Sequence, residues 1–159
     1  MENQKLIQKG SRILEIGVNK QTFVKSFSDI VGKDGRVYYF DINREELNRV
    51  SKIKKNNIRP HYLFGGEYKI KGELDLIFLN ESYRHFKNRS EYFRYMKKYL
   101  SPFGKVVIIQ EDSLPTLNFL LGRTVKRKTI IDEMVDAGFR LRQEHFFLKN
   151  KSFLTFERI

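Results

Sequence analysis

Two acidic residues stand near the ends of predicted strands, where side chains can meet a ligand. Glu15 lies in the apolar segment ILEIG, which ends at Gly17, and Asp41 follows a second apolar segment, VYYF. An acid about two dozen residues after a glycine turn can accept hydrogen bonds from both hydroxyls of a ribose. Taken singly, Glu15 could be a turn carboxylate and Asp41 a helix cap. The pairing of the glycine turn with the distant Asp41 carries more weight than either part alone and favours a ligand that carries a ribose.

The turn after Gly17 differs from a glycine-rich loop at two positions. Asn19 and Gln21 occupy places where further glycines are expected. Asparagine is the residue other than glycine that best adopts positive φ, so Asn19 can keep the turn. Gln21 is harder to accommodate, because its side chain can fill space needed by a ligand or by close helix–strand packing. The loop is either a ligand-binding turn with unusual residues or the remnant of one.

Apolar segments bounded by turn residues predict the strands and helices that position these side chains. Pro60 is expected to begin the third of five strands, which cover 12–16, 36–40, 61–64, 74–79 and 104–109. Asn43 is expected to cap the second of three intervening helices, which cover 21–31, 43–55 and 88–100. The sequence Ser-Pro-Phe-Gly should end the third helix. Strands and helices therefore alternate along the first two thirds of the chain.

The last third of the chain predicts one helix and a hairpin. The helix covers 127–137 and ends at Gly138, and the two strands, 139–148 and 151–159, flank Lys149 and Asn150. Strands that alternate with helices form a parallel sheet with right-handed crossovers, to which the hairpin adds an antiparallel strand. No linker or repeat interrupts the 159 residues, so we expect a single domain over 1–159.

Composition excludes several classes of protein and site. The chain has no cysteine, which excludes disulfides, thiolate metal sites and a cysteine nucleophile. No His/Asp/Glu cluster has the spacing of a metal site, and His61 and His145 lie in predicted strands, where we read them as structural. The first residues lack the apolar region of a secretion signal, and no apolar run would span a bilayer. We therefore expect a cytoplasmic protein without membrane segments.

Five segments together resemble a known family. ILEIG, YYFDIN, LDLIFLNESYRHF, LSPFGKVVIIQED and IIDEMVDAGFRLRQEHFFLKNKSFLTFER occur in the order and spacing of the class I S-adenosylmethionine-dependent methyltransferases, and the chain is most similar to their compact small-molecule branch. The resemblance implies a Rossmann-like three-layer α/β sandwich with a seven-stranded, mostly parallel sheet and a C-terminal antiparallel hairpin. It also implies an enzyme that transfers a methyl group from S-adenosylmethionine to a small-molecule acceptor.

The resemblance implies a set of cofactor-binding residues. Glu15 and Gly17 would border the methionine end of S-adenosylmethionine, with Asn19 keeping the turn. Asp41 would hold the ribose hydroxyls, and Ile42 would pack on the adenine face.

Two further positions complete the implied cofactor site. Asn80, at the end of the fourth strand, would line the methionine and sulfonium region. Glu67 stands one residue beyond the place where the family offers an Asp to the adenine amino group. Glu67 either substitutes for that Asp or is surface charge in a loop.

On the acceptor side the candidates are Asn80, Glu81, Tyr83, His85 and Glu111. Methyl transfer needs an in-line approach to the sulfonium methyl group and, for some acceptors, a base. His85 has the natural pKa for that base, although a His before Phe in this loop is also a common family feature without catalytic duty. Residues 112–128 could form an acceptor lid or a helix packed on the sheet.

Two other functions remain open beside the small-molecule enzyme. A methyltransferase-like domain that has lost the cofactor could serve as a binding or scaffold subunit. Asn19, Gln21 and Gly66 favour this alternative, whereas Asp41 and the fourth-strand segment oppose it. RNA methylation is suggested by the net charge of +12 alone, because 80–83 read NESY instead of the Asn/Asp-Pro-Pro-aromatic motif. A domain this small could leave its site open, form a homodimer or use a partner subunit.

Overall fold

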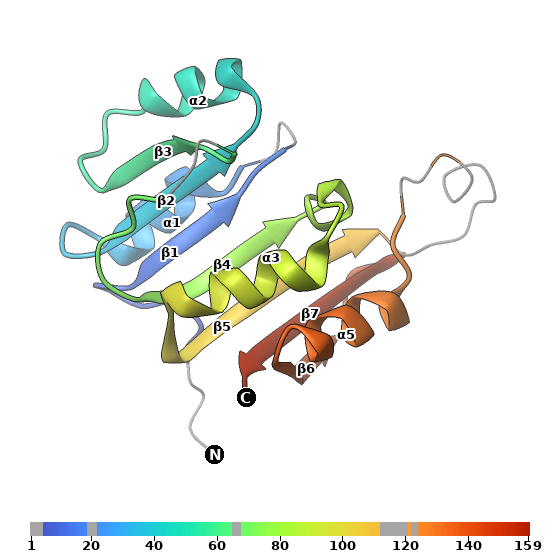
Figure 1. The fold of residues 1–159 in the computed structure, drawn as a ribbon. Coiled ribbons are helices and arrows are strands. Elements are labelled where there is room, and N and C mark those ends of the chain that lie inside the picture. Colours follow the sequence, from blue (N-terminus) through green and yellow to red (C-terminus); the bar gives the residue numbers. More distant parts are fainter. Residues whose placement is uncertain (1–4, 19–21, 65–67, 112–120, 122–123) are drawn as a thin grey trace.

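A seven-stranded sheet forms the centre of the molecule (Figure 1). The computed structural model describes residues 5–18, 22–64, 68–111, 121 and 124–159. The strands are β1 (Arg12–Ile16), β2 (Arg36–Asp41), β3 (Ile58–Tyr62), β4 (Leu74–Asn80), β5 (Leu100–Glu111), β6 (Phe139–His145) and β7 (Lys151–Arg158). Their order is β3-β2-β1-β4-β5-β7-β6, in which β1 to β5 pair in parallel and β7 pairs antiparallel with both neighbours. The predicted fold class is confirmed.

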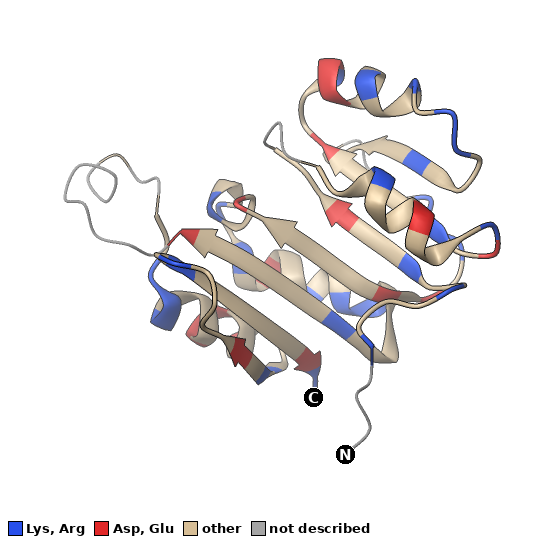
Figure 2. Cartoon of the chain, turned by 180° about the vertical axis from the view of Figure 1, so that it is seen from behind, with Lys and Arg blue, Asp and Glu red and all other residues tan. Residues whose placement is uncertain are grey.

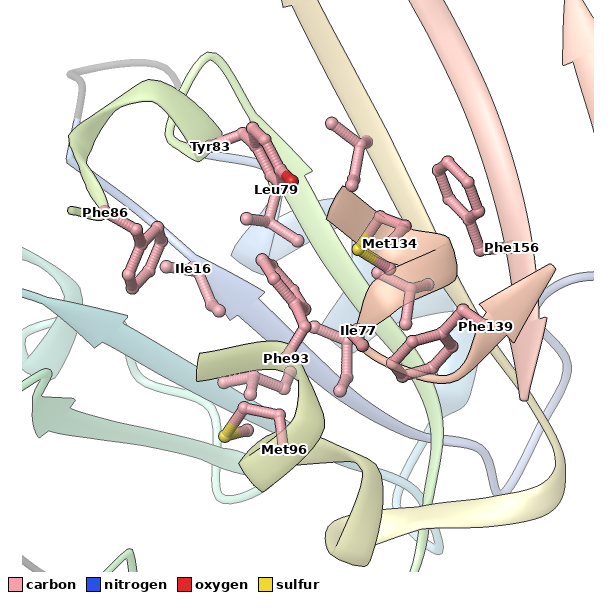
Figure 3. Packing of buried hydrophobic residues seen from close by; sticks show 14 of the residues in the cluster. Ile16, Ile77, Leu79, Tyr83, Phe86, Phe93, Met96, Met134, Phe139 and Phe156 are labelled. Atoms are coloured by element: carbon pink, nitrogen blue, oxygen red, sulfur yellow. The ribbon is translucent and has the colours of Figure 1, made fainter. Parts of the chain in front are cut away.

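Helices cover both faces of the sheet and each face has its own apolar core. On one face, α1 (Val24–Val31) and α2 (Arg44–Ser51) pack through Val24, Phe27 and Val50 against alternate residues of the strands. On the other, α3 (Arg89–Met96) and α5 (Arg127–Asp136) pack through Phe93 and Met134, as Figure 3 shows. Successive strand residues therefore point into different cores.

The predicted caps and turns explain where several elements begin and end. The Asn43 side chain accepts a hydrogen bond from the Glu45 amide at 2.9 Å, which caps α2 as expected. In the closing hairpin, Asn150 has φ +59°, a left-handed conformation that asparagine tolerates. Gly138, with φ +89°, follows α5.

The start of the third strand was predicted wrongly. β3 begins at Ile58, and Pro60 lies within it. The Val37 amide of β2 donates to the Asn57 carbonyl at 2.8 Å, and the Leu63 amide donates to the Asp41 carbonyl at 2.9 Å. Backbone groups alternate sides along a strand, so the nitrogen of Pro60 faces away from β2. Because β3 is an edge strand, the missing N–H of Pro60 breaks no hydrogen bond of the sheet.

The boundary between the third predicted helix and the fifth strand was also wrong. α3 ends at Met96, a 3₁₀ turn η2 (Lys97–Tyr99) follows, and β5 begins at Leu100. The Ser-Pro-Phe-Gly sequence lies inside β5, where the pairing with β4 jumps from Leu74↔Leu100 to Leu76↔Lys105. A bulge absorbs these residues, so a sequence that normally ends elements here bends a strand instead.

The connection from β3 to β4 contains no helix in its described residues, 63, 64 and 68–73. Its Tyr68 covers part of the sheet: the hydroxyl donates to the Leu63 carbonyl at 2.6 Å, and the ring packs on Phe40 with centroids 4.5 Å apart. Among the described residues, this face of the sheet is therefore covered near β3 by a loop (Figure 1).

None of the described helices is long and apolar enough to cross a membrane. Figure 2 shows Lys and Arg on helices, strands and connections across the molecule, interspersed with Asp and Glu.

Candidate active site

The strand order of the sheet reverses between β1 and β4, which makes this place the topological switch point. From β1 the sheet runs through β2 to β3 on one side and through β4 to β5 on the other. The register aligns Ile16 of β1 with Phe40 of β2 and Leu79 of β4. The residues that follow directly therefore lie at the same level of the sheet; they are Gly17, Asp41 and Asn80. Ligands of open α/β sheets bind at such a reversal, so the fold brings these three predicted residues to one place.

Glu15 holds the turn after β1 to the start of α1. Its side chain is 2% exposed, and its two carboxylate oxygens accept hydrogen bonds from the Phe23 amide at 2.9 and 3.1 Å. Phe23 precedes the first residue of α1, so the carboxylate satisfies one of the amides that a helix N-terminus leaves without an intrahelical partner. In the described residues Glu15 therefore has a structural contact, which fixes the turn beside the site.

Burial raises the pKa of Glu15 to about 7. The hydrogen bonds from Phe23 and Thr22 act in the opposite direction, and the charge of Asp41 adds to the increase. Two acidic groups therefore lie close enough at the ends of β1 and β2 to influence each other.

Gly17 is required by the approach of β2. A Cβ atom at this position would lie 2.2 Å from the Tyr39 hydroxyl oxygen and 2.6 Å from Asp41 Oδ2. The Gly17 amide donates to the Phe40 carbonyl at 2.7 Å, which holds the turn on β2. No side chain fits here without displacing the two polar groups.

Asp41 is fully buried, and each of its carboxylate oxygens accepts one hydrogen bond from the protein. Asn43 donates its amide to Oδ1 at 2.8 Å, and the Tyr39 hydroxyl donates to Oδ2 at 2.6 Å. Sequence reasoning missed Tyr39, although residues i and i+2 of a strand point to the same face. Ile42, the next residue, is 41% exposed and offers an apolar surface beside the carboxylate.

The end of β4 carries the second group of predicted residues. Asn80 is buried, and Glu81 has φ +58°, a strained conformation for a residue other than glycine. Glu81 Oε2 accepts hydrogen bonds from Gln110 Nε2 at 3.0 Å and from the Glu111 amide at 3.2 Å, and Oε1 lies 2.8 Å from Lys151 Nζ. The side chain of Glu81 is thus tied to β5 and β7.

Ser82 follows directly and is fully buried. Among the described residues its hydroxyl has no hydrogen-bond partner. A buried hydroxyl without a partner is costly, and one next to the carboxyl end of β4 is suited to a ligand.

The two other candidates of this loop point in different directions. Tyr83 is buried in the core, where Figure 3 shows it close to Leu79, and its hydroxyl donates to Glu133 Oε2 at 2.8 Å. His85 is exposed. Burial of part of its ring and the charge of Arg84 lower its pKa, whereas the charge of Asp41 raises it. His85 is therefore close enough to Asp41 to sense its charge, and Tyr83 belongs to the core.

The remaining sequence candidates have other contacts or lie outside the described residues. His61 packs on Tyr38 and Phe40, and His145 packs on Phe153, which agrees with the structural roles expected for both. The described residues contain no group of His, Asp and Glu that could hold a metal ion. Outside the described residues lie Asn19, Gln21, Glu67 and most of 112–128.

A cavity of ≈ 500 Å³ lies beside the carboxyl end of β3, on the face covered by α3. Its wall is mainly aromatic, with side chains from Phe64, Tyr68, Phe86, Tyr92 and Tyr95. Asn88 and Glu91, from the start of α3, add polar groups. The size is that of a small-molecule pocket, and Phe86 follows His85 directly in the chain.

Comparison with known proteins gives one family match and several structural ones. The methyltransferase domain family matches residues 2–153. The ubiquinone/menaquinone biosynthesis C-methyltransferase UbiE of Vibrio parahaemolyticus is 26% identical over an alignment of 118 residues, which covers 68% of this chain and 44% of the relative. The chain thus spans less than half the length of that curated protein.

Solved structures share the fold at low sequence identity. A SAM-dependent methyltransferase from Aquifex aeolicus has a TM-score of 0.83 at 18% identity, with 96% of this chain and 85% of the other covered. Fibrillarin of Aeropyrum pernix, with natively bound S-adenosyl-L-methionine, has a TM-score of 0.71 at 17% identity, with 98% and 70% covered.

Proposed function

The chain belongs to the methyltransferase domain family of class I S-adenosylmethionine-dependent enzymes, and from this premise we propose that it transfers a methyl group from S-adenosylmethionine to a small-molecule acceptor. The observation that carries the proposal is the pairing of Gly17 with Asp41. A turn that admits no side chain lies next to an oriented carboxylate at the reversal point of the sheet.

The residues of the site fit the cofactor in three respects. The carboxylate of Asp41 can accept about four hydrogen bonds and receives two from the described residues, so two positions remain there for a ribose diol. Ile42 exposes an apolar side chain beside it for the adenine ring. At the end of β4, the buried Ser82 hydroxyl has no partner among the described residues. Asp41, Ile42 and Ser82 would therefore hold the cofactor, together with Asn80 at the same end of β4.

The cofactor supplies an activated methyl group on a sulfonium ion, so the protein has to orient the acceptor and, where needed, accept a proton. We assign the base role to His85, because it is exposed in the loop after β4, and because burial of part of its ring and the charge of Arg84 lower its pKa. This lowering, which the charge of Asp41 opposes, favours the neutral form that a base requires. Asn80 would position the reacting groups from the end of β4.

The aromatic cavity supports a small molecule as the acceptor. Its volume lies within the range of ligand pockets, and its aromatic wall suits an apolar or planar molecule. Methyl label supplied on the cofactor should then appear in the small-molecule fraction of a cell extract. Label found only in RNA would contradict this assignment.

Cofactor binding is the direct test of the proposal. A ligand at 100 times its dissociation constant stabilises a fold by about 2.7 kcal/mol, which for a chain of this length corresponds to a rise in Tm of roughly 5 to 10 °C. Millimolar S-adenosylmethionine or S-adenosylhomocysteine should produce such a rise in the wild type, and Asp41→Ala should abolish it.

Asp75→Ala is the matched control. Asp75 also lies on a central strand, but its carboxylate accepts a hydrogen bond from the Arg12 amide at the amino ends of β4 and β1, away from the site, so the rise in Tm should persist. A wild type that shows neither a rise in Tm nor heat of binding in calorimetry would overturn the enzyme proposal.

One observation favours a second candidate, a methyltransferase-like binding or scaffold subunit without cofactor. Asp41 is fully buried, and its two hydrogen bonds to the protein could make it a purely structural carboxylate. This candidate predicts no calorimetric binding of S-adenosylhomocysteine by the wild type, whereas the enzyme proposal predicts binding that depends on Asp41.

A further inference from the structure

Tyr39 lies beneath the Gly17 turn and is the largest fully buried side chain of β2 near the site. It stands two residues before Asp41, so both side chains point to the face that α1 and α2 cover. Most of the ring packs in that core beside Ile13 and Val37. Only the hydroxyl reaches the polar groups at the carboxyl ends of β1 and β2.

The hydroxyl of Tyr39 contacts both halves of the candidate ribose site. It donates to Asp41 Oδ2 at 2.6 Å, a short distance typical of hydrogen bonds to ionised groups. It also lies where a Cβ on Gly17 would come within 2.2 Å. The phenol therefore fills the gap between the β1 turn and the end of β2, and it sets their spacing.

The two hydrogen bonds that Asp41 accepts from described residues go to different oxygens of its carboxylate. Within the part of the chain that the structure describes, Asn43 donates to Oδ1 and Tyr39 to Oδ2, so one acceptor position remains on each oxygen. The two hydroxyls of a ribose diol provide one donor for each. With a donor already fixed on each oxygen, rotation of the carboxylate would break a hydrogen bond, so its orientation is set before a ligand arrives.

The phenol stays protonated under ordinary conditions. Burial and the hydrogen bond to Asp41 raise the pKa of Tyr39, and the charge of Glu15 acts in the same direction. Tyr39 therefore remains a donor to Asp41 across the pH range in which an enzyme works.

We propose that Tyr39 is a positioning residue for cofactor binding, which orients Asp41 toward the ribose hydroxyls and holds the Gly17 turn at the distance that the ribose requires. This assignment rests on the proposed function. It predicts that the Tyr39 hydroxyl acts on the ligand only through the ribose hydroxyls and not through the adenine or methionine ends.

Tyr39→Phe is the test, since it removes the hydroxyl and keeps the ring. Calorimetry should show S-adenosylhomocysteine binding about tenfold weaker than in the wild type, the size expected for one hydrogen bond to a charged group. The 2′,3′-dideoxy analogue of S-adenosylhomocysteine should bind the wild type and Tyr39→Phe equally. A Tyr39→p-aminophenylalanine variant restores a donor and should recover most of the affinity, which a purely structural loss would not allow.

Tyr38→Phe is the matched control from the same strand. Its hydroxyl faces the other core and, among the described residues, bonds only to the Lys71 backbone, accepting from the amide at 2.9 Å and donating to the carbonyl at 3.3 Å. This variant should bind S-adenosylhomocysteine like the wild type.

The outcomes separate this assignment from the proposed function. A wild type that does not bind S-adenosylhomocysteine would overturn both. Wild-type binding that Tyr39→Phe leaves unchanged, or weakens equally for the dideoxy analogue, would overturn the role of Tyr39 alone.

Discussion

Folding raises the pKa of Glu15 into a range where the effect on protein stability can be measured. Its pKa in the folded protein is about 7, mainly because of burial, against an ordinary value of 4.5. Between these two values the folded state binds a proton that the unfolded state does not bind. The free energy of unfolding should therefore decrease as pH rises from about 4.5 to about 7.

Glu15→Gln should remove this dependence. The glutamine carbonyl can still accept from the Phe23 amide, but it has no charge to bury. The variant should gain stability relative to the wild type as pH rises, by up to about 3 kcal/mol at pH 7.5 compared with pH 4.5. Urea denaturation of both proteins at several pH values measures the difference, in which the other acidic groups cancel. A difference independent of pH would contradict burial as the cause.

At the residue scale, sequence spacing located Gly17 and Asp41 but not the group between them. Both follow apolar segments, so their place at the carboxyl ends of β1 and β2 could be predicted. Tyr39 reads as one more core residue in VYYF, and nothing local indicates that its hydroxyl meets a turn from another strand. That contact depends on the register of β1 with β2, which the sequence pattern alone does not specify.

At the element scale, one carboxylate joins three elements below the site. Glu133 of α5 accepts hydrogen bonds from the Tyr83 hydroxyl at 2.8 Å and from Arg89 Nε and Nη2 at 2.7 and 2.8 Å. Tyr83 belongs to the 3₁₀ turn η1 (Tyr83–His85), which also carries His85, and Arg89 begins α3. The position of His85 therefore depends on a contact made far along the chain.

Glu133→Ala should destabilise the protein by about 2 to 3 kcal/mol, because it leaves Arg89 and the Tyr83 hydroxyl without their shared partner. Chemical denaturation measures this loss. Asp136→Ala on the same helix is the control: its ion pair with Arg94 is largely exposed and should be worth less than about 0.5 kcal/mol. Equal effects of the two substitutions would contradict the linking role of Glu133.

Most element types were predictable, and the errors have a common physical origin. Helix α2 and the closing hairpin follow from local signals, the Asn43 cap and the Lys149–Asn150 turn. Pro60 and Ser-Pro-Phe-Gly are local stop signals that the sheet overrides, because an edge strand tolerates a proline that faces outward and a bulge accommodates extra residues. Pairing partners decide these cases, and they are remote in sequence.

At the scale of the whole molecule, the loop between β3 and β4 gives the two faces of the sheet different characters. Near β3, α2 covers one face of the sheet. On the other face, Tyr68 covers the sheet and also lines the aromatic cavity. The sheet and helices could be predicted from periodicity. The cavity could not, because its wall combines Phe64 and Tyr68 with Tyr92 and Tyr95 of α3, which are remote from them in sequence.

Pro60 also affects how copies of the molecule meet one another. An open sheet presents unpaired backbone groups at both edges, and such edges invite strands from other molecules to add on. At the β6 edge, the exposed Arg140 and Arg142 and the irregular pairing near Leu141 oppose strand addition. At the β3 edge, the outward nitrogen of Pro60 offers no donor in the middle of the strand.

Pro60→Val should convert the β3 edge into a site of self-association. Valine restores the outward donor and favours extended structure, so light scattering after size exclusion should show a larger mass than the wild type at equal concentration. Pro60→Lys restores the same donor but adds a charge, and it should keep the wild-type mass. If Pro60→Val does not change the mass either, the proline has no such role. If the mass does increase, the missing N–H of one residue prevents the sheet from being extended by strands of other molecules into aggregates.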